Sequence, residues 1–176
     1  MATHPDAIIR FYKSDMILQI NSDASYLTAP KSRSRAGGHL FLGSVQVNNV
    51  PIKLNGTIHY LCTILRFVVS LAAEAELGAL LLNAREEKII RITLHKLGHP
   101  QPPTPIHVDN TMVKGIFNNT IKRQRSRSME IRYFWLLDGE AQKRFCFPSS
   151  PWSRKSGKLP HKILHHERRT TCQTIL

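Results

Sequence analysis

The stretch MILQINSD at residues 16–23 decides the fold, because its apolar and polar residues alternate until it ends at Asp23. Alternation with a period of two predicts a β-strand with one buried face. A second short apolar run, PIHVD at 105–109, ends at Asp109 directly after a proline-rich breaker. Each run therefore predicts a strand with a carboxylate at its end, and the two carboxylates together could form the floor of one site.

A third acid comes from a predicted helix. The run LAAEAELGALLLNAR at 71–85 is rich in helix formers, Ser70 is available as an N-cap, and residues 86–97 continue the pattern. Glu74 and Glu76 are two positions apart, which is about 200° around a helix, so only one of them can face a given site. Taken singly, such acids are most simply turn formers, caps or favourable charges in a first helical turn. Taken together, they supply the hard oxygen ligands that Mg²⁺ prefers.

The rest of the sequence predicts an α/β domain. Residues 28–38 form a turn-rich basic connection, residues 39–47 a second strand and residues 57–63 a third, so we expect the first three strands to be antiparallel. A short helix reaching about Phe117 and another helix at 128–142 follow the fourth strand. The order of three strands, a helix, a strand and a helix predicts an α/β domain with a mixed sheet.

The chain is strongly basic, with a net charge of +13, and residues 141–176 hold about half of this excess. Such a charge favours a polyanionic partner, although charge alone does not separate nucleic acid from an anionic membrane surface. The three cysteines lack a paired short spacing, which predicts neither a disulfide framework nor a strong zinc site. Residues 1–15 are too polar for a signal peptide, and charged residues interrupt the apolar stretch at 64–82. We expect an intracellular protein, cytoplasmic or nuclear, that is not secreted and does not span a membrane.

Two clusters of basic residues are candidates for contact with nucleic acid. One cluster is a run beside the aromatic segment RYFW at 132–135, and the other lies in the basic connection; the candidates are Lys122, Arg123, Arg125, Arg127, Arg33 and Arg35. Basic side chains beside aromatic rings suit a nucleic-acid backbone, with an affinity that falls as salt rises. The alternative is that the basic residues are solvated loop charges. For the aromatic residues we expect at least partial burial in the core, because helical spacing turns at least one of them inward.

From residue 2 to residue 142 the chain resembles the RNase H domain of a copia-type LTR retrotransposon polyprotein. The resemblance rests on five blocks in fixed order: NSDASYL, RSRAGGHLFLG, AAEAELGALL, LGHPQPPTPIHVDN and MEIRYFW. It implies an RNase H-like fold, with a mixed five-stranded sheet flanked by helices. It also implies cleavage of the RNA strand of RNA–DNA hybrids by two Mg²⁺ ions, or Mn²⁺, held by Asp23, Glu76 and Asp109. The run Glu76–Leu77–Gly78–Ala79 fits the family pattern around the metal-binding glutamate, which selects Glu76 over Glu74.

The resemblance ends after Gln142. The family continues with a segment that carries a fourth carboxylate, for which this chain has no counterpart, since Glu167 is the only acid in residues 143–176. We interpret residues 143–176 as a frameshifted, basic tail that packs outside the core. Residues 1–15 resemble the connection from the polymerase region, so we interpret the chain as truncated at its N-terminus. The expected RNase H-like domain spans residues 16–142, and we expect it to be a monomer in isolation.

Two functions remain open from the sequence. The first is an RNase H nuclease that binds RNA–DNA hybrids or other nucleic acid, weakened by the missing fourth carboxylate. The second is a non-catalytic, basic nucleic-acid-binding remnant of the same fold. Loss of one ligand from a two-metal site costs orders of magnitude in rate, which favours the remnant.

Overall fold

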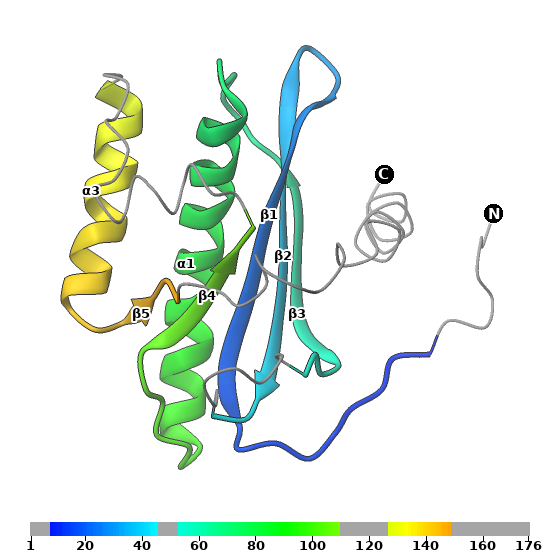
Figure 1. The fold of residues 1–176 in the computed structure, drawn as a ribbon, viewed down its shortest axis with the longest axis vertical. Coiled ribbons are helices and arrows are strands. Elements are labelled where there is room, and N and C mark those ends of the chain that lie inside the picture. Colours follow the sequence, from blue (N-terminus) through cyan, green and yellow to red (C-terminus); the bar gives the residue numbers. More distant parts are fainter. Residues whose placement is uncertain (1–7, 46–52, 110–126, 149–176) are drawn as a thin grey trace.

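The computed structural model describes residues 8–45, 53–109 and 127–148. A five-stranded sheet forms its centre, and two helices lie beside the sheet (Figure 1). In chain order the elements are β1 (Ile17–Ala29), β2 (Arg33–Gly43), β3 (Thr57–Ile64), α1 (Ala72–Lys96), β4 (Thr104–Val108), α3 (Arg127–Ala141) and β5 (Phe145–Cys146). The short helix expected near residue 117 lies outside the described residues.

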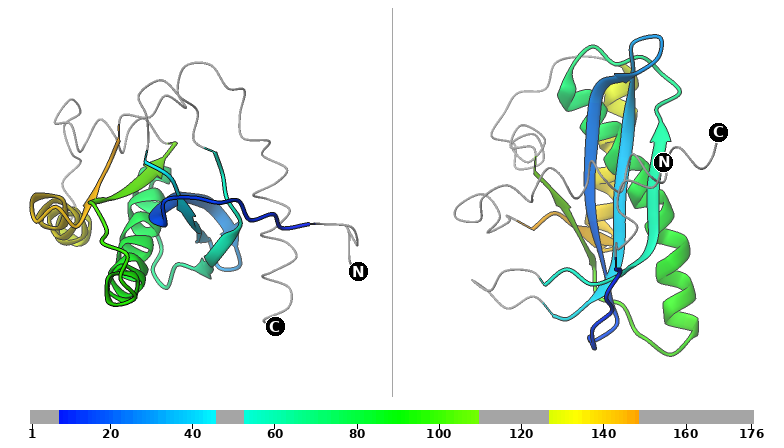
Figure 2. Two further views of the ribbon diagram at one scale, coloured as in Figure 1. Left: turned by 90° about the horizontal axis from the view of Figure 1, so that it is seen from below. Right: turned by 90° about the vertical axis from the view of Figure 1, so that its right-hand side faces the viewer.

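The strand order across the sheet is β3-β2-β1-β4-β5. Strands β1, β2 and β3 are antiparallel neighbours, whereas β4 runs parallel to β1 and β5 parallel to β4. This arrangement confirms the expected mixed sheet with an antiparallel start. The right-hand view of Figure 2 shows the long strands β1 and β2, in blue and cyan, running along the molecule in front of α1.

The main core lies between the sheet and α1. Alternate residues of β1 and β2, such as Leu18, Ile20 and Leu40, are fully buried and pack with Leu77 and Leu80 of α1. α3 lies on the far side of α1 from the long strands and adds its own buried apolar residues to the same core (Figure 1). Burial of this apolar surface is the main favourable contribution to folding, so it holds α1 against the sheet.

The β1–β2 hairpin differs from the expectation. β1 does not end at Asp23 but continues to Ala29, and most of the expected connection at 28–38 belongs to β2. The turn between the strands is short, and Lys31 and Ser32 in it have positive φ angles of 58° and 52°. Turns with two left-handed residues match the twist of an antiparallel hairpin, so a tight turn replaces the predicted loop.

α1 is one continuous helix of 25 residues, which confirms the helix expected from 70 to 97 but not its first residue. The N-cap is Leu71, which makes no side-chain capping bond, and not Ser70. Instead, the backbone N–H of Ser70 donates a hydrogen bond of 2.8 Å to the carboxylate of Glu74. In the part of the chain that the structure describes, no helix is long and apolar enough to cross a membrane.

The sheet extends beyond the boundary that we expected at residue 142. Phe145 of β5 is fully buried, and its ring stacks on Trp135 with centroids 6.4 Å apart. The backbone N–H of Thr104 also donates to the carbonyl of Arg144, at 3.0 Å. The expectation that packing ends at residue 142 is therefore wrong for residues 144–148, which are buried or half-buried, and the rest of the expected tail, from 149, lies outside the described residues.

Residues 8–15 are joined to the loop that leads into β3. The side chain of Asn55 accepts a hydrogen bond from the backbone N–H of Tyr12 at 2.7 Å and donates one to the carbonyl of Tyr12 at 2.9 Å. Asn55 also donates to the carbonyl of Leu42 at 2.7 Å. One amide side chain thus connects the N-terminal segment to the end of β2.

The burial of Phe145 leads to a stability prediction. Replacing Phe145 by Ala should lower the free energy of unfolding in urea by about 3–5 kcal/mol, because a large buried ring leaves a cavity. Phe134, whose side chain on α3 is 54% exposed, is the matched control, and Phe134→Ala should change stability by about 0.5 kcal/mol. Equal and small effects of the two substitutions would show that β5 is not part of the folded domain.

Candidate metal centre

The parallel pairing of β1 with β4 brings two aspartates together. In this register Asn21 lies beside His107 and Ser22 beside Val108, and this is the last pair. The next residue of each chain segment is an aspartate, Asp23 in β1 and Asp109 after β4. Because adjacent parallel strands keep a constant register, the two aspartates lie next to each other where the β1–β4 pairing ends.

Glu76 reaches this point from the first turns of α1. Carboxylate oxygens of Asp23, Glu76 and Asp109, which we call the candidate metal centre, all lie within 4.8 Å of one another. The backbone N–H of Ala24, next to Asp23, donates a hydrogen bond to the Glu76 carboxylate. The structure thus brings together all three acids that the sequence singles out, although their expected role in catalysis stays a prediction.

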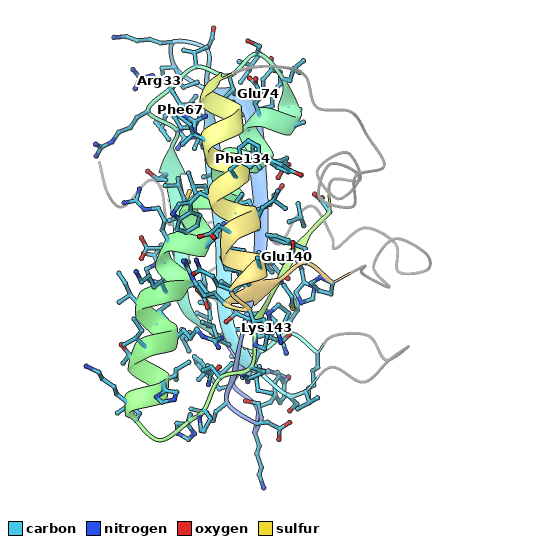
Figure 3. All side chains as sticks on the ribbon, turned by 90° about the vertical axis from the view of Figure 1, so that its left-hand side faces the viewer. Arg33, Phe67, Glu74, Phe134, Glu140 and Lys143 are labelled. Atoms are coloured by element: carbon cyan, nitrogen blue, oxygen red, sulfur yellow. The ribbon has the colours of Figure 1, made fainter. Side chains whose placement is uncertain are left out.

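Glu74 does not belong to this group. Its carboxylate instead accepts the hydrogen bond from the backbone N–H of Ser70 that precedes α1. Figure 3 shows Glu74 at the end of the molecule where α1 begins. The helical geometry that allows only one of the two glutamates to face the aspartates is therefore confirmed.

The candidate metal centre is an unfavourable place for negative charge without a cation. Glu76 is only 8% exposed, and burial raises its pKa to about 8, with a further upward contribution from the charge of Asp109. The hydrogen bond from Ala24 acts in the opposite direction but is the smaller effect. One carboxylate oxygen of Glu76, Oε2, is buried without a hydrogen-bond partner among the described residues.

These features fit a divalent cation. All the donors are carboxylate oxygens, which hard cations such as Mg²⁺ and Mn²⁺ accept as ligands. The cluster opens to solvent on the side of Asp109, which is exposed, while Glu76 closes the buried side. A cation bound here would supply the partner that the buried Glu76 oxygen lacks.

The predicted nucleic-acid contacts are only partly within the described residues. Arg33 and Arg35 are half-buried residues of β2 and not of a loop, and Figure 3 shows Arg33 at the same end of the molecule as Glu74. Arg35 lies opposite Ser25, and Gly37 opposite Asp23, so alternation along the strands puts Arg35 on the same face of the sheet as Asp23. The structure does not describe the other predicted contacts. These are Lys122, Arg123, Arg125 and the side chain of Arg127, the first residue of α3.

The aromatic segment at 132–135 divides as expected between core and surface. Tyr133 is buried at 3% exposure, Phe134 is exposed, and Trp135 is half-buried against Phe145. Figure 3 shows Phe134 on α3. Of the three rings in this segment, Phe134 is therefore the most exposed to solvent.

Asn83 of α1 is a polar residue near the centre that the sequence analysis missed. It is fully buried, and its amide nitrogen lies 3.0 Å from the hydroxyl of Ser22 and 2.9 Å from the carbonyl oxygen of Gly37. The signal in the sequence was a single asparagine within the apolar run LLLNA. Ser22 precedes Asp23 and Gly37 lies opposite it in the sheet, and neither partner could be identified without the fold.

No protein-family model and no curated protein matches this sequence. Solved structures do match it. The N-terminal RNase H domain of a Mycobacterium tuberculosis protein, solved as a fusion with maltose-binding protein, is 12% identical and covers 92% of this chain and 99% of that chain, with a TM-score of 0.54. The fold is the RNase H fold. A crystal structure of LC11-RNase H1 in complex with RNA/DNA hybrid is 10% identical and covers 79% of this chain and 88% of that chain, with a TM-score of 0.53. At these identities, the likeness establishes the RNase H fold alone.

The raised pKa of Glu76 predicts an unusual pH dependence of stability. Because the folded protein keeps a proton that the unfolded chain releases above its ordinary pKa of 4.5, the metal-free protein should lose stability as the pH rises from about 4.5 to about 8. Glu76→Gln removes this titration and should flatten the decline in melting temperature, measured between pH 5 and pH 9 in the presence of a chelator. Glu74→Gln is the matched control and should keep the wild-type slope. A wild-type protein whose stability rises over this range would contradict the burial of an unpaired Glu76 carboxylate.

Proposed function

We propose that this chain is an RNase H-like domain that binds RNA–DNA hybrids and holds divalent cations, Mg²⁺ or Mn²⁺, at the candidate metal centre. The observation that carries the proposal is the convergence of Asp23, Glu76 and Asp109 within 4.8 Å on an RNase H fold. One of the similar structures, LC11-RNase H1, was solved in complex with RNA/DNA hybrid, which supports the choice of substrate.

Each acid has a distinct part in this proposal. Asp109 is exposed and Asp23 half-buried, so they present oxygens toward an incoming phosphate, while Glu76 holds the buried side. A pair of bound cations would activate a water molecule for attack on the scissile phosphate and stabilise the leaving oxygen. The raised pKa of Glu76 means that its carboxyl group gives up a proton when a cation binds near neutral pH.

Basic residues provide the grip on the hybrid. Arg35 lies on the same face of the sheet as Asp23 and two residues before Gly37 in β2, a distance of about 7 Å along the strand. Gly37, opposite Asp23, has no side chain that could keep a phosphate backbone away. Arg35 therefore gives this face of the sheet a positive charge near the acids. In the sequence, the basic run at 122–127 adds further positive charge that would favour binding of phosphates.

We propose further that hybrid cleavage by this chain is weak. The sequence after Gln142 has no counterpart of the fourth carboxylate of the family, and a two-metal site that lacks one ligand loses much of its rate. The alternative is a remnant that binds nucleic acid without any turnover. This alternative is favoured by the same missing ligand, so the two proposals differ only in residual activity. The resemblance to copia-type domains adds the proposal that the chain derives from a retrotransposon polyprotein and acts inside the cell.

Binding and cleavage should separate in an assay with a labelled RNA–DNA hybrid. Asp23→Asn should leave hybrid affinity unchanged or slightly raised, because it removes a negative charge that faces phosphates. Arg123→Ala with Arg125→Ala should weaken binding and lower the salt slope by about one unit for each lost phosphate contact. Mg²⁺-dependent cleavage by the wild type should be weak or absent.

The matched control is Arg85→Ala, which removes an exposed charge nine positions from Glu76 and hence on the opposite side of α1. This variant should keep the wild-type salt slope. Robust turnover that Asp23→Asn abolishes would refute the remnant and show that another group supplies the fourth ligand. The absence of salt-dependent hybrid binding would overturn both proposals.

A further inference from the structure

We propose that Asn83 is a positioning residue, which holds α1 in register against β1 and β2 so that Glu76 reaches Asp23. The effect of Asn83 on metal binding rests on the proposed function, whereas its effect on the position of α1 does not. Asn83 is fully buried in α1, and its hydrogen-bond partners lie in three different elements. The amide nitrogen is 3.0 Å from Ser22 Oγ in β1, 2.9 Å from the Gly37 carbonyl in β2 and 3.1 Å from the Ala79 carbonyl in α1 itself.

The spacing of Asn83 and Glu76 puts both side chains on one face of α1. Seven residues turn the helix by about 700°, which is 20° short of two full turns, and advance it by about 10.5 Å. The two side chains therefore contact the same strand at two points. An apolar helix face permits sliding and rotation on a sheet, whereas a directed hydrogen bond at a second point resists both.

The two contact points enclose Asp23. Asn83 bonds to Ser22, the residue before Asp23, and Glu76 accepts a bond from the backbone N–H of Ala24, the residue after it. The carbonyl that also accepts from Asn83 belongs to Gly37, which lies directly opposite Asp23 in the sheet. One amide thus fixes the strand position of Asp23 from two sides.

The sheet leaves space for this amide at Gly38. A Cβ atom built on Gly38 would lie 1.8 Å from Oδ1 of Asn83 and 2.8 Å from its Cγ, so any larger residue would displace the Asn83 side chain. Gly38 pairs with Ser22 across the hairpin. The amide therefore fits only where a serine and a glycine stand side by side in β1 and β2.

The test compares two ways of removing the amide contact. Asn83→Leu keeps a buried side chain of similar size without the donors, and Gly38→Ala keeps Asn83 but pushes its amide away. Both variants should weaken Mn²⁺ binding in calorimetry by roughly tenfold or more, as expected for a residue that orients a metal ligand. Without metal, both should also speed hydrogen exchange at the backbone N–H of Ala24, because Glu76 no longer stays in place to accept its bond.

Gly43→Ala is the matched control, since it makes the same change in the same strand but meets the Gln19 side chain instead, at 2.5 Å. This variant should keep the wild-type Mn²⁺ affinity and Ala24 exchange, even if its melting temperature falls. Unchanged Mn²⁺ affinity and Ala24 exchange in folded Gly38→Ala would overturn the positioning role, whether or not Asn83→Leu folds. If the wild type binds no Mn²⁺, the metal-binding proposal fails, and the exchange rate at Ala24 alone decides the role of Asn83.

Discussion

The parallel register of β1 and β4 is the constraint on which the candidate metal centre depends. It ends at Ser22 and Val108, and it therefore places the two following aspartates beside each other, although their like charges repel. Beyond this pair β1 continues without β4 at its side, which leaves the backbone N–H of Ala24 for the Glu76 carboxylate. Shifting the register by one residue would turn Asp23 away from Asp109 and bury it against α1.

Holding these acids together opposes stability, and burial of the core offsets this cost. The apolar contact of α1 with β1 and β2 forces Glu76 into a position where its pKa rises to about 8. A carboxyl group whose pKa is strongly shifted by burial and by a nearby charge marks a candidate functional site.

Local patterns in the sequence predict most of the elements, and tertiary contacts explain the differences. Alternation identified β1 but not its end. β1 continues past Asp23 because it pairs with β2 up to a hairpin turn in which Lys31 and Ser32 have positive φ angles. Helical spacing distinguished Glu76 from Glu74 correctly, since that argument needs only the geometry of one helix. β5 is two residues long and has no periodicity, and Phe145 belongs to the core only through β4 and α3. The hydrogen bonds of Asn83 join it to residues 46 and 61 positions away in the sequence, and no local pattern contains such contacts.

We propose above all that Asp23, Glu76 and Asp109 together bind a divalent cation on an RNase H fold. A crystal structure of the chain grown with Mn²⁺ tests it most directly, because the anomalous signal of manganese locates the ion without reference to the protein chain. We expect an anomalous peak within about 2.5 Å of oxygens from at least two of the three acids, with Glu76 among the ligands. A well-ordered cluster with no peak at saturating Mn²⁺, or a peak held by Glu74 instead, would contradict it.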